Sequence, residues 1–97
     1  MTIARVILIN LANGKSGDAE RVWKEECAPL MIRQKGCRSE KFMRSLDRPE
    51  LFISYSEWDA MEDVEHYRSG TDHKTIQSEV NALQGARAVV WCYEILD

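Results

Sequence analysis

Ser54, Ser56 and Trp58 place two hydroxyl groups and an indole ring on one side of a predicted strand. They alternate along residues 51–58, LFISYSEW, and this period of two is typical of a half-buried strand. Small polar residues beside one large ring can leave room for a ligand, with hydroxyls that donate hydrogen bonds and an indole that forms a wall. Two alternatives stay open. Trp58 can pack where strand meets helix, and the serines can bond locally.

Tyr67 and His73 are the candidates for proton transfer. Tyr67 has helical spacing with Val64, so its ring should point inward while its hydroxyl needs a partner. His73 shares the apolar face of the next predicted helix with Ile76 and Val80. Because it lies near the positive N-terminal end of that helix, its pKa should be lowered, which favours the neutral, basic form. Alternatively, both can be core residues whose polar groups form hydrogen bonds within the protein.

Arg5 is the only charged residue in the apolar segment IARVILINL, residues 3–11. A charge in such a segment needs a partner when the strand is buried. Arg5 can hold an anionic group of a ligand, or it can form an ion pair with Glu57 or Glu94. The ion pair is the favoured interpretation. His66 lies off the apolar stripe of its helix and is expected at the surface.

These residues belong to an alternating order of secondary structure. The predicted order is strand, helix, strand, strand, helix, helix, strand, over residues 3–11, 18–35, 37–46, 51–58, 59–70, 71–84 and 88–96. Pro29 should interrupt the first helix after Cys27. Asp59 is the expected N-cap of the second helix. Gly36, Gly70 and Gly85 should end the three helices.

With right-handed crossovers, this order predicts a ferredoxin-like α+β domain, a split βαβ with a four-stranded antiparallel sheet. Residues 37–46 form its charged edge strand and pair with residues 51–58 as a hairpin. Helices can cover only one face of the sheet, yet the first and last strands are apolar on both sides. The uncovered face therefore predicts a homodimer whose two sheets pack face to face.

Composition narrows the classes of function. The chain has 97 residues, which suits one domain over residues 1–97, and its formal net charge is −3. Basic residues scattered among acids exclude a nucleic-acid surface, and no apolar run is typical of a membrane span or a signal peptide. Cys27, Cys37 and Cys92 lack the spacing of metal ligands and are expected to be reduced, mostly buried thiols of a cytoplasmic protein.

Residues 49–73, PELFISYSEWDAMEDVEHYRSGTDH, join a strand ending in Trp58 to a short helix and to a helix start with a small residue three positions before His73. With the element order over residues 3–96, this stretch resembles the antibiotic biosynthesis monooxygenase family of the dimeric α+β barrel superfamily. The resemblance implies a barrel formed by the sheets of two subunits and a pocket between sheet and helices in each. It also implies that some members oxygenate polycyclic phenols or quinols without metal or flavin, while related members degrade haem.

Individual positions refine what the resemblance implies. The haem-degrading relatives have an Asn in the first strand, a Trp in the second helix and a His in the third. This chain has Ile7, Tyr67 and Gln77 at the aligned positions, which argues against haem breakdown. The cofactor-free oxygenases commonly have an Asn four residues before the Trp that ends the third strand. This chain has Ser54 four residues before Trp58.

The combined prediction is a cofactor-independent monooxygenase that acts on an aromatic or quinol-like small molecule. His73 and Tyr67 are its predicted catalytic residues, and Trp58, Ser54 and Ser56 are its predicted substrate-binding residues. No metal and no cofactor are expected, because the substrate anion itself reduces O₂ once the site stabilises an oxyanion and excludes water. The alternative is a non-catalytic ligand-binding or stress-related dimer with the same pocket, and haem binding is a third.

Overall fold

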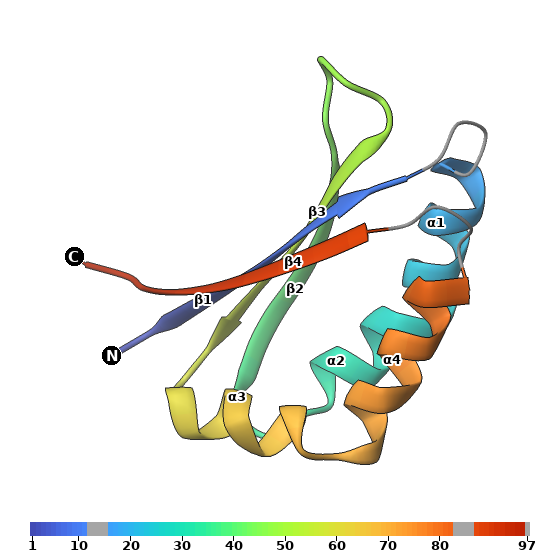
Figure 1. The fold of residues 1–97 in the computed structure, drawn as a ribbon. Coiled ribbons are helices and arrows are strands. Elements are labelled where there is room, and N and C mark those ends of the chain that lie inside the picture. The colour runs from blue at the N-terminus through green and yellow to red at the C-terminus, as the bar shows by residue number, and fades with distance from the viewer. Residues whose placement is uncertain (12–15, 83–86, 97) are drawn as a thin grey trace.

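The computed structural model describes residues 1–11, 16–82 and 87–96 (Figure 1). Its four strands are β1 (Ile3–Asn10), β2 (Cys37–Arg44), β3 (Leu51–Trp58) and β4 (Arg87–Glu94). They form an antiparallel sheet in the order β2-β3-β1-β4. This order confirms the ferredoxin-like α+β fold, with the predicted hairpin between β2 and β3. The apolar β1 lies in the centre, where neighbouring strands satisfy both of its edges.

All helices lie on one side of the sheet (Figure 1). They are α1 (Ser16–Val22), the π-helix η1 (Trp23–Cys27), α2 (Ala28–Ile32), α3 (Met61–Arg68) and α4 (Thr71–Ala82). At the predicted bend or interruption after Cys27, the π-helical turn ends and α2 begins, with Pro29 in the first turn of α2, while Cys27 and Ala28 keep helical φ and ψ angles. A proline is tolerated in a first turn, where its missing N–H has no partner to lose.

Three predicted boundaries need correction. Ala60, and not Asp59, is the N-cap of α3, and no side chain caps this helix. Asp59 follows the last residue of β3; its backbone N–H pairs with the Gly36 carbonyl at 2.8 Å, and its carboxylate accepts a hydrogen bond from Arg38. The first helix ends at Ile32, short of residue 35, and β2 ends at Arg44, short of residue 46. The predicted end of α4 at residues 83–85 lies outside the described residues.

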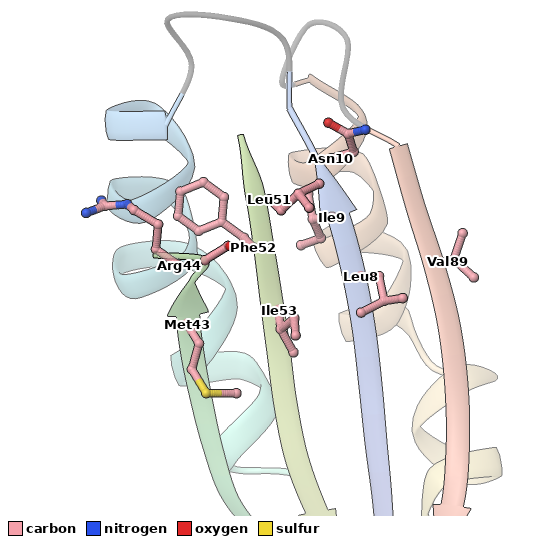
Figure 2. Close-up of a pocket in the computed structure, with 10 residues that line it drawn as sticks. Leu8, Ile9, Asn10, Met43, Arg44, Leu51, Phe52, Ile53 and Val89 are labelled. Atoms are coloured by element: carbon pink, nitrogen blue, oxygen red, sulfur yellow. The ribbon is translucent and has the colours of Figure 1, made fainter. Parts of the chain in front are cut away.

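The two sides of β3 differ as the alternation predicts. Phe52, Ser54, Ser56 and Trp58 are all buried under the helices. The opposite side of the sheet carries a set of exposed or half-exposed apolar residues, here called the helix-free face: Val6, Leu8, Met43, Ile53, Val89 and Trp91. A hollow of about 630 Å³ is lined by residues of this face and by Ile9, Arg44 and Phe52 of the other side. Figure 2 shows Leu8, Met43, Ile53 and Val89 projecting from four different strands. A contiguous set of exposed apolar side chains is typical of a surface that another protein or a ligand covers.

Candidate active site

A cavity of about 210 Å³ lies between the sheet and the helices. Four elements supply its inner wall: Arg5 and Ile7 from β1, Trp23 from η1, Tyr67 from α3 and His73 from α4. The exposed residues Gln77, Ala88 and Val90 also line it, so its mouth lies between α4 and β4. Two of the five predicted site residues, Tyr67 and His73, are therefore brought together in one cavity.

Tyr67 is buried in the middle of a row of rings. Its ring centroid lies 5.5 Å from that of Trp58 and 5.1 Å from that of His73, which it meets edge-on. Its hydroxyl is buried and has no hydrogen-bond partner among the described residues. Burial raises the pKa of Tyr67 to about 12, and the Arg5 charge opposes this rise. At neutral pH the hydroxyl is thus protonated and free to donate to a bound oxygen atom.

His73 is half-buried at the first turn of α4. Burial lowers its pKa, and the positive charges of Arg5 and Arg68 lower it further. The direction agrees with the prediction, although desolvation is the largest cause. A neutral imidazole on a cavity wall is able to accept a proton from a ligand.

Arg5 is the one charged side chain of the inner wall. It is 2% exposed, and its Nε and Nη1 atoms are buried with no acceptor among the described residues. Its guanidinium carbon lies 5.4 Å from the centroid of the Tyr67 ring. The predicted ion pair with Glu57 is wrong, because β3 places Glu57 opposite Ala4, where it accepts a hydrogen bond from Tyr55 at 2.9 Å. Nor does Arg5 form an ion pair with Glu94 within the described part of the chain.

Trp58, Ser54 and Ser56 lie together but outside the cavity lining. Trp58 is fully buried and donates its indole N–H to the Ser56 hydroxyl at 2.9 Å. Ser54 is also fully buried and donates to the Glu40 carboxylate at 2.9 Å. Trp58 packs against the Tyr67 ring, and the two serines lie beside the cavity-lining residues Ile7 and Arg5 of β1.

Glu40 is a functional candidate that sequence reasoning missed. Its Oε1 atom accepts hydrogen bonds from Ser54 at 2.9 Å and from the Trp23 indole at 3.0 Å, while its Oε2 atom is buried without a partner. Burial raises the pKa of Glu40 to about 7, although these two bonds and the Arg5 charge act in the opposite direction. The strand period of two could have predicted this position. Phe42 points into the core, so Glu40, two positions earlier in the same strand, must also point inward.

Other chemistries find little support in the described residues. Nowhere in residues 1–11, 16–82 and 87–96 do three or more His, Cys, Asp or Glu residues gather as a metal site would require. All three cysteines are free, and burial raises the pKa of Cys27 to about 12 and that of Cys37 to about 11. Cys92 is exposed, which corrects the expectation of mostly buried thiols, because it lies on the edge strand β4. Across the same described ranges, no helix is long and apolar enough to span a membrane.

Comparison with protein families decides the relationship. The family model of the antibiotic biosynthesis monooxygenases matches residues 2–79. The chain belongs to this family. A comparison with curated protein sequences finds no match.

Solved structures of this monooxygenase family and of other proteins share the fold. SnoaB, a cofactor-independent oxygenase from Streptomyces nogalater, superposes with a TM-score of 0.86 at 14% identity, over 99% of this chain and 94% of that chain. Rv0793 from Mycobacterium tuberculosis gives a TM-score of 0.78 at 17% identity, over 98% and 96% of the two chains. A conserved protein from Methanosarcina mazei Go1 gives 0.80 at 17% identity, over 96% and 92%. At these identities the similarity establishes the fold alone.

Ile7, Tyr67 and Gln77, the three positions that the sequence analysis compared with the haem-degrading relatives, all line the cavity. Ser54, Ser56 and Trp58, the predicted substrate-binding residues, do not line it.

Proposed function

We propose that this protein is a cofactor-independent monooxygenase that acts on an aromatic or quinol-like small molecule in the cavity between sheet and helices. One observation carries the proposal: the same cavity is lined by a neutral imidazole, a protonated phenol and a guanidinium, and the phenol hydroxyl and the guanidinium Nε and Nη1 groups have no partner among the described residues. Removal of a proton and stabilisation of the resulting anion are what such an oxygenation requires. Membership of the monooxygenase family supports it.

In the proposed reaction, His73 accepts a proton from an acidic C–H or O–H group of the substrate. The electron-rich anion then reduces O₂, and a carbon–oxygen bond forms to give a hydroperoxide. Loss of water from the hydroperoxide leaves a carbonyl group, so that one oxygen atom enters the product and the other leaves as water with the two hydrogens of the oxidised carbon. Tyr67 donates a hydrogen bond to the developing oxyanion.

The roles proposed for Trp58, Ser54 and Ser56 follow from their contacts outside the cavity lining. Trp58 supports the Tyr67 ring, and the serines hold Trp58 and Glu40 in place.

Oxygen consumption with a panel of quinols and anthrones tests the proposal. His73→Ala should lower the rate with an accepted substrate by about 100-fold or more, the usual contribution of a general base. The exposed His66 is the matched control, since His66→Ala removes an imidazole outside the cavity and should leave the rate unchanged. Full turnover by His73→Ala would exclude the assigned proton acceptor.

We also propose a homodimer in which the helix-free faces of two subunits pack against each other. The exposed apolar side chains of this face support the proposal, including Trp91, which is 54% exposed. Leu8→Glu should shift the mass measured by light scattering from dimer to monomer, whereas a monomeric wild-type protein at micromolar concentration would refute it. A cytoplasmic location is proposed from the three free cysteines.

A second function from another class is a non-catalytic ligand-binding or stress-related dimer with the same cavity. Ser54 favours it, because an Asn is common there in the cofactor-free oxygenases and Ser54 is instead bonded to Glu40. Ligand binding without oxygen uptake across the panel would support this alternative. Haem binding is a third candidate, which a missing Soret band after addition of haem would dismiss.

A further inference from the structure

The guanidinium of Arg5 is a buried cation that lacks an acceptor. Its side chain is 2% exposed, and its Nε and Nη1 groups find no hydrogen-bond partner among the described residues. A buried charge without a partner is costly, since desolvation is not offset by an opposite charge. Such an arrangement is typical of a group whose partner arrives with a ligand.

No carboxylate among the described residues is hydrogen-bonded to the buried Nε and Nη1 groups of Arg5. The charge of Glu40 raises the Arg5 pKa, but the Oε1 atom of Glu40 accepts from Trp23 and Ser54, and its Oε2 atom has no partner among the described residues. Glu57 lies on the other side of the sheet. The described part of the chain therefore leaves the Nε and Nη1 groups of Arg5 without a carboxylate.

The cavity around Arg5 has the shape and lining for a flat ring. Beside the guanidinium are the rings of Trp23 and Tyr67, and Ile7, Ile76 and Val80 complete an apolar wall. A volume of about 210 Å³ is below the roughly 300–1,000 Å³ of pockets for drug-sized ligands. The space suits one or two fused rings better than a polycyclic system.

We propose that Arg5 binds an anionic oxygen of the ligand, and that the cavity takes a small aromatic molecule of one or two rings that carries a carboxylate or an ionised hydroxyl. The Tyr67 hydroxyl, which has no partner either, donates to the same oxygen. This inference narrows the substrate class of the proposed oxygenase and rests on the same cavity.

Paired probes that differ in charge test the inference on the wild-type protein. Isothermal titration compares 1-naphthoate with the uncharged 1-naphthamide, and 4-nitrophenolate with 4-nitroanisole at a pH where the phenol is ionised. The anionic member of at least one pair should bind about 10-fold or more tightly, since hydrogen bonds to charged groups are the strong ones. The two pairs distinguish a carboxylate from a phenolate. Equal affinity within both pairs, or no binding of either anion at millimolar concentration, overturns the inference.

Variants locate the preference at one residue. Arg5→Gln removes the charge and should abolish the preference for the anionic probe while the neutral analogue binds as before. Arg68→Gln is the matched control, because Arg68 is an exposed cation near the cavity that does not line it. The control should keep the preference within about twofold, as expected for an exposed charge. If the preference for the anionic probe survived in Arg5→Gln and disappeared in Arg68→Gln, the assignment of the anion to Arg5 would be wrong.

The result separates this inference from the proposed oxygenase. Binding of an anionic probe through Arg5 without oxygen uptake on any quinol would retain the anion site and remove the oxygenase. Oxygen uptake without any preference for the anionic probes would retain the oxygenase and remove the anion site.

Discussion

Two clusters of polar residues lie under the same helices, and they differ in how their groups are bonded. In the bonded cluster, hydrogen bonds of 2.9 Å join Trp58 to Ser56 and Ser54 to Glu40, although the Oε2 atom of Glu40 has no partner among the described residues. In the cavity cluster, Tyr67 contacts His73 edge-on and lies under the Arg5 guanidinium, and the Nε and Nη1 groups of Arg5 and the hydroxyl of Tyr67 have no partner in the described part of the chain.

The difference separates packing from binding. Polar groups that satisfy each other hold the sheet and helices together, whereas unsatisfied groups around a cavity lower stability and are available to a ligand. Trp58 was predicted to form a wall of the pocket, with packing as the open alternative, and it lies in the bonded cluster. Four substitutions sharpen this comparison, in decreasing order of their expected effect on the free energy of unfolding.

Trp58→Ala should have the largest effect. It removes a fully buried indole and leaves a cavity, which costs about 3–5 kcal/mol of the free energy of unfolding. Urea denaturation measures the loss, and Trp58→Phe, which keeps a ring, is the control with a smaller loss. If Trp58→Ala cost less than about 1 kcal/mol, Trp58 would belong to the open part of the site and not to the bonded cluster.

Glu40→Gln tests the one titratable group of the bonded cluster. Because burial raises the pKa of Glu40 from an ordinary 4.5 to about 7, the folded protein holds this proton more tightly than the unfolded chain. Its contribution to stability is therefore present below pH 4.5 and is lost as the pH rises to about 7.

We expect Glu40 to account for a loss on the order of 2–3 kcal/mol across that window, and Glu40→Gln to remove this part of the pH dependence. Denaturation at several pH values gives the comparison. Glu62→Gln, an exposed control on α3, should follow the wild-type curve. Parallel curves for wild type and Glu40→Gln would mean that Glu40 is solvated.

Arg5→Met should increase stability, in contrast to Trp58→Ala. It replaces an unpartnered buried cation by an apolar chain of similar length, which is often worth about 1–3 kcal/mol. Thermal unfolding measures the gain in stability. The same variant should no longer bind the anionic probe more tightly than its neutral analogue. A destabilised Arg5→Met would place Arg5 among the groups that hold the fold.

His73→Ala should change stability least, by less than about 1 kcal/mol, because His73 is half-buried and packs mainly on the edge of Tyr67. The same variant is expected to lose oxygen uptake. Loss of stability and activity together, by several kcal/mol, would show that the two clusters form one structural unit.

Several features of the fold could be predicted from the sequence because they depend on neighbours a few residues away. The alternation over residues 51–58 separated the buried side of β3 from its helix-free side. Pro29 marked the end of the π-helical turn. The prediction that Gly36 ends the helix was wrong, because α2 ends at Ile32 with Arg33 as its C-cap, and Gly36, with a φ of 85°, lies in the turn directly before β2. Tyr67 and His73 were expected to point inward from their helical spacing, and both line the cavity.

The rest was decided by contacts between segments far apart in the chain. The register of β1 and β3 sets Glu57 opposite Ala4 and so keeps it from Arg5. Packing of η1 and β2 brings Trp23 and Glu40 to 3.0 Å, which gives Ser54 a partner inside the protein. Sequence alone determined which side chains face the interior, since strand and helix periods are local. Only the tertiary structure decided which of them find partners there and which are left open to a ligand.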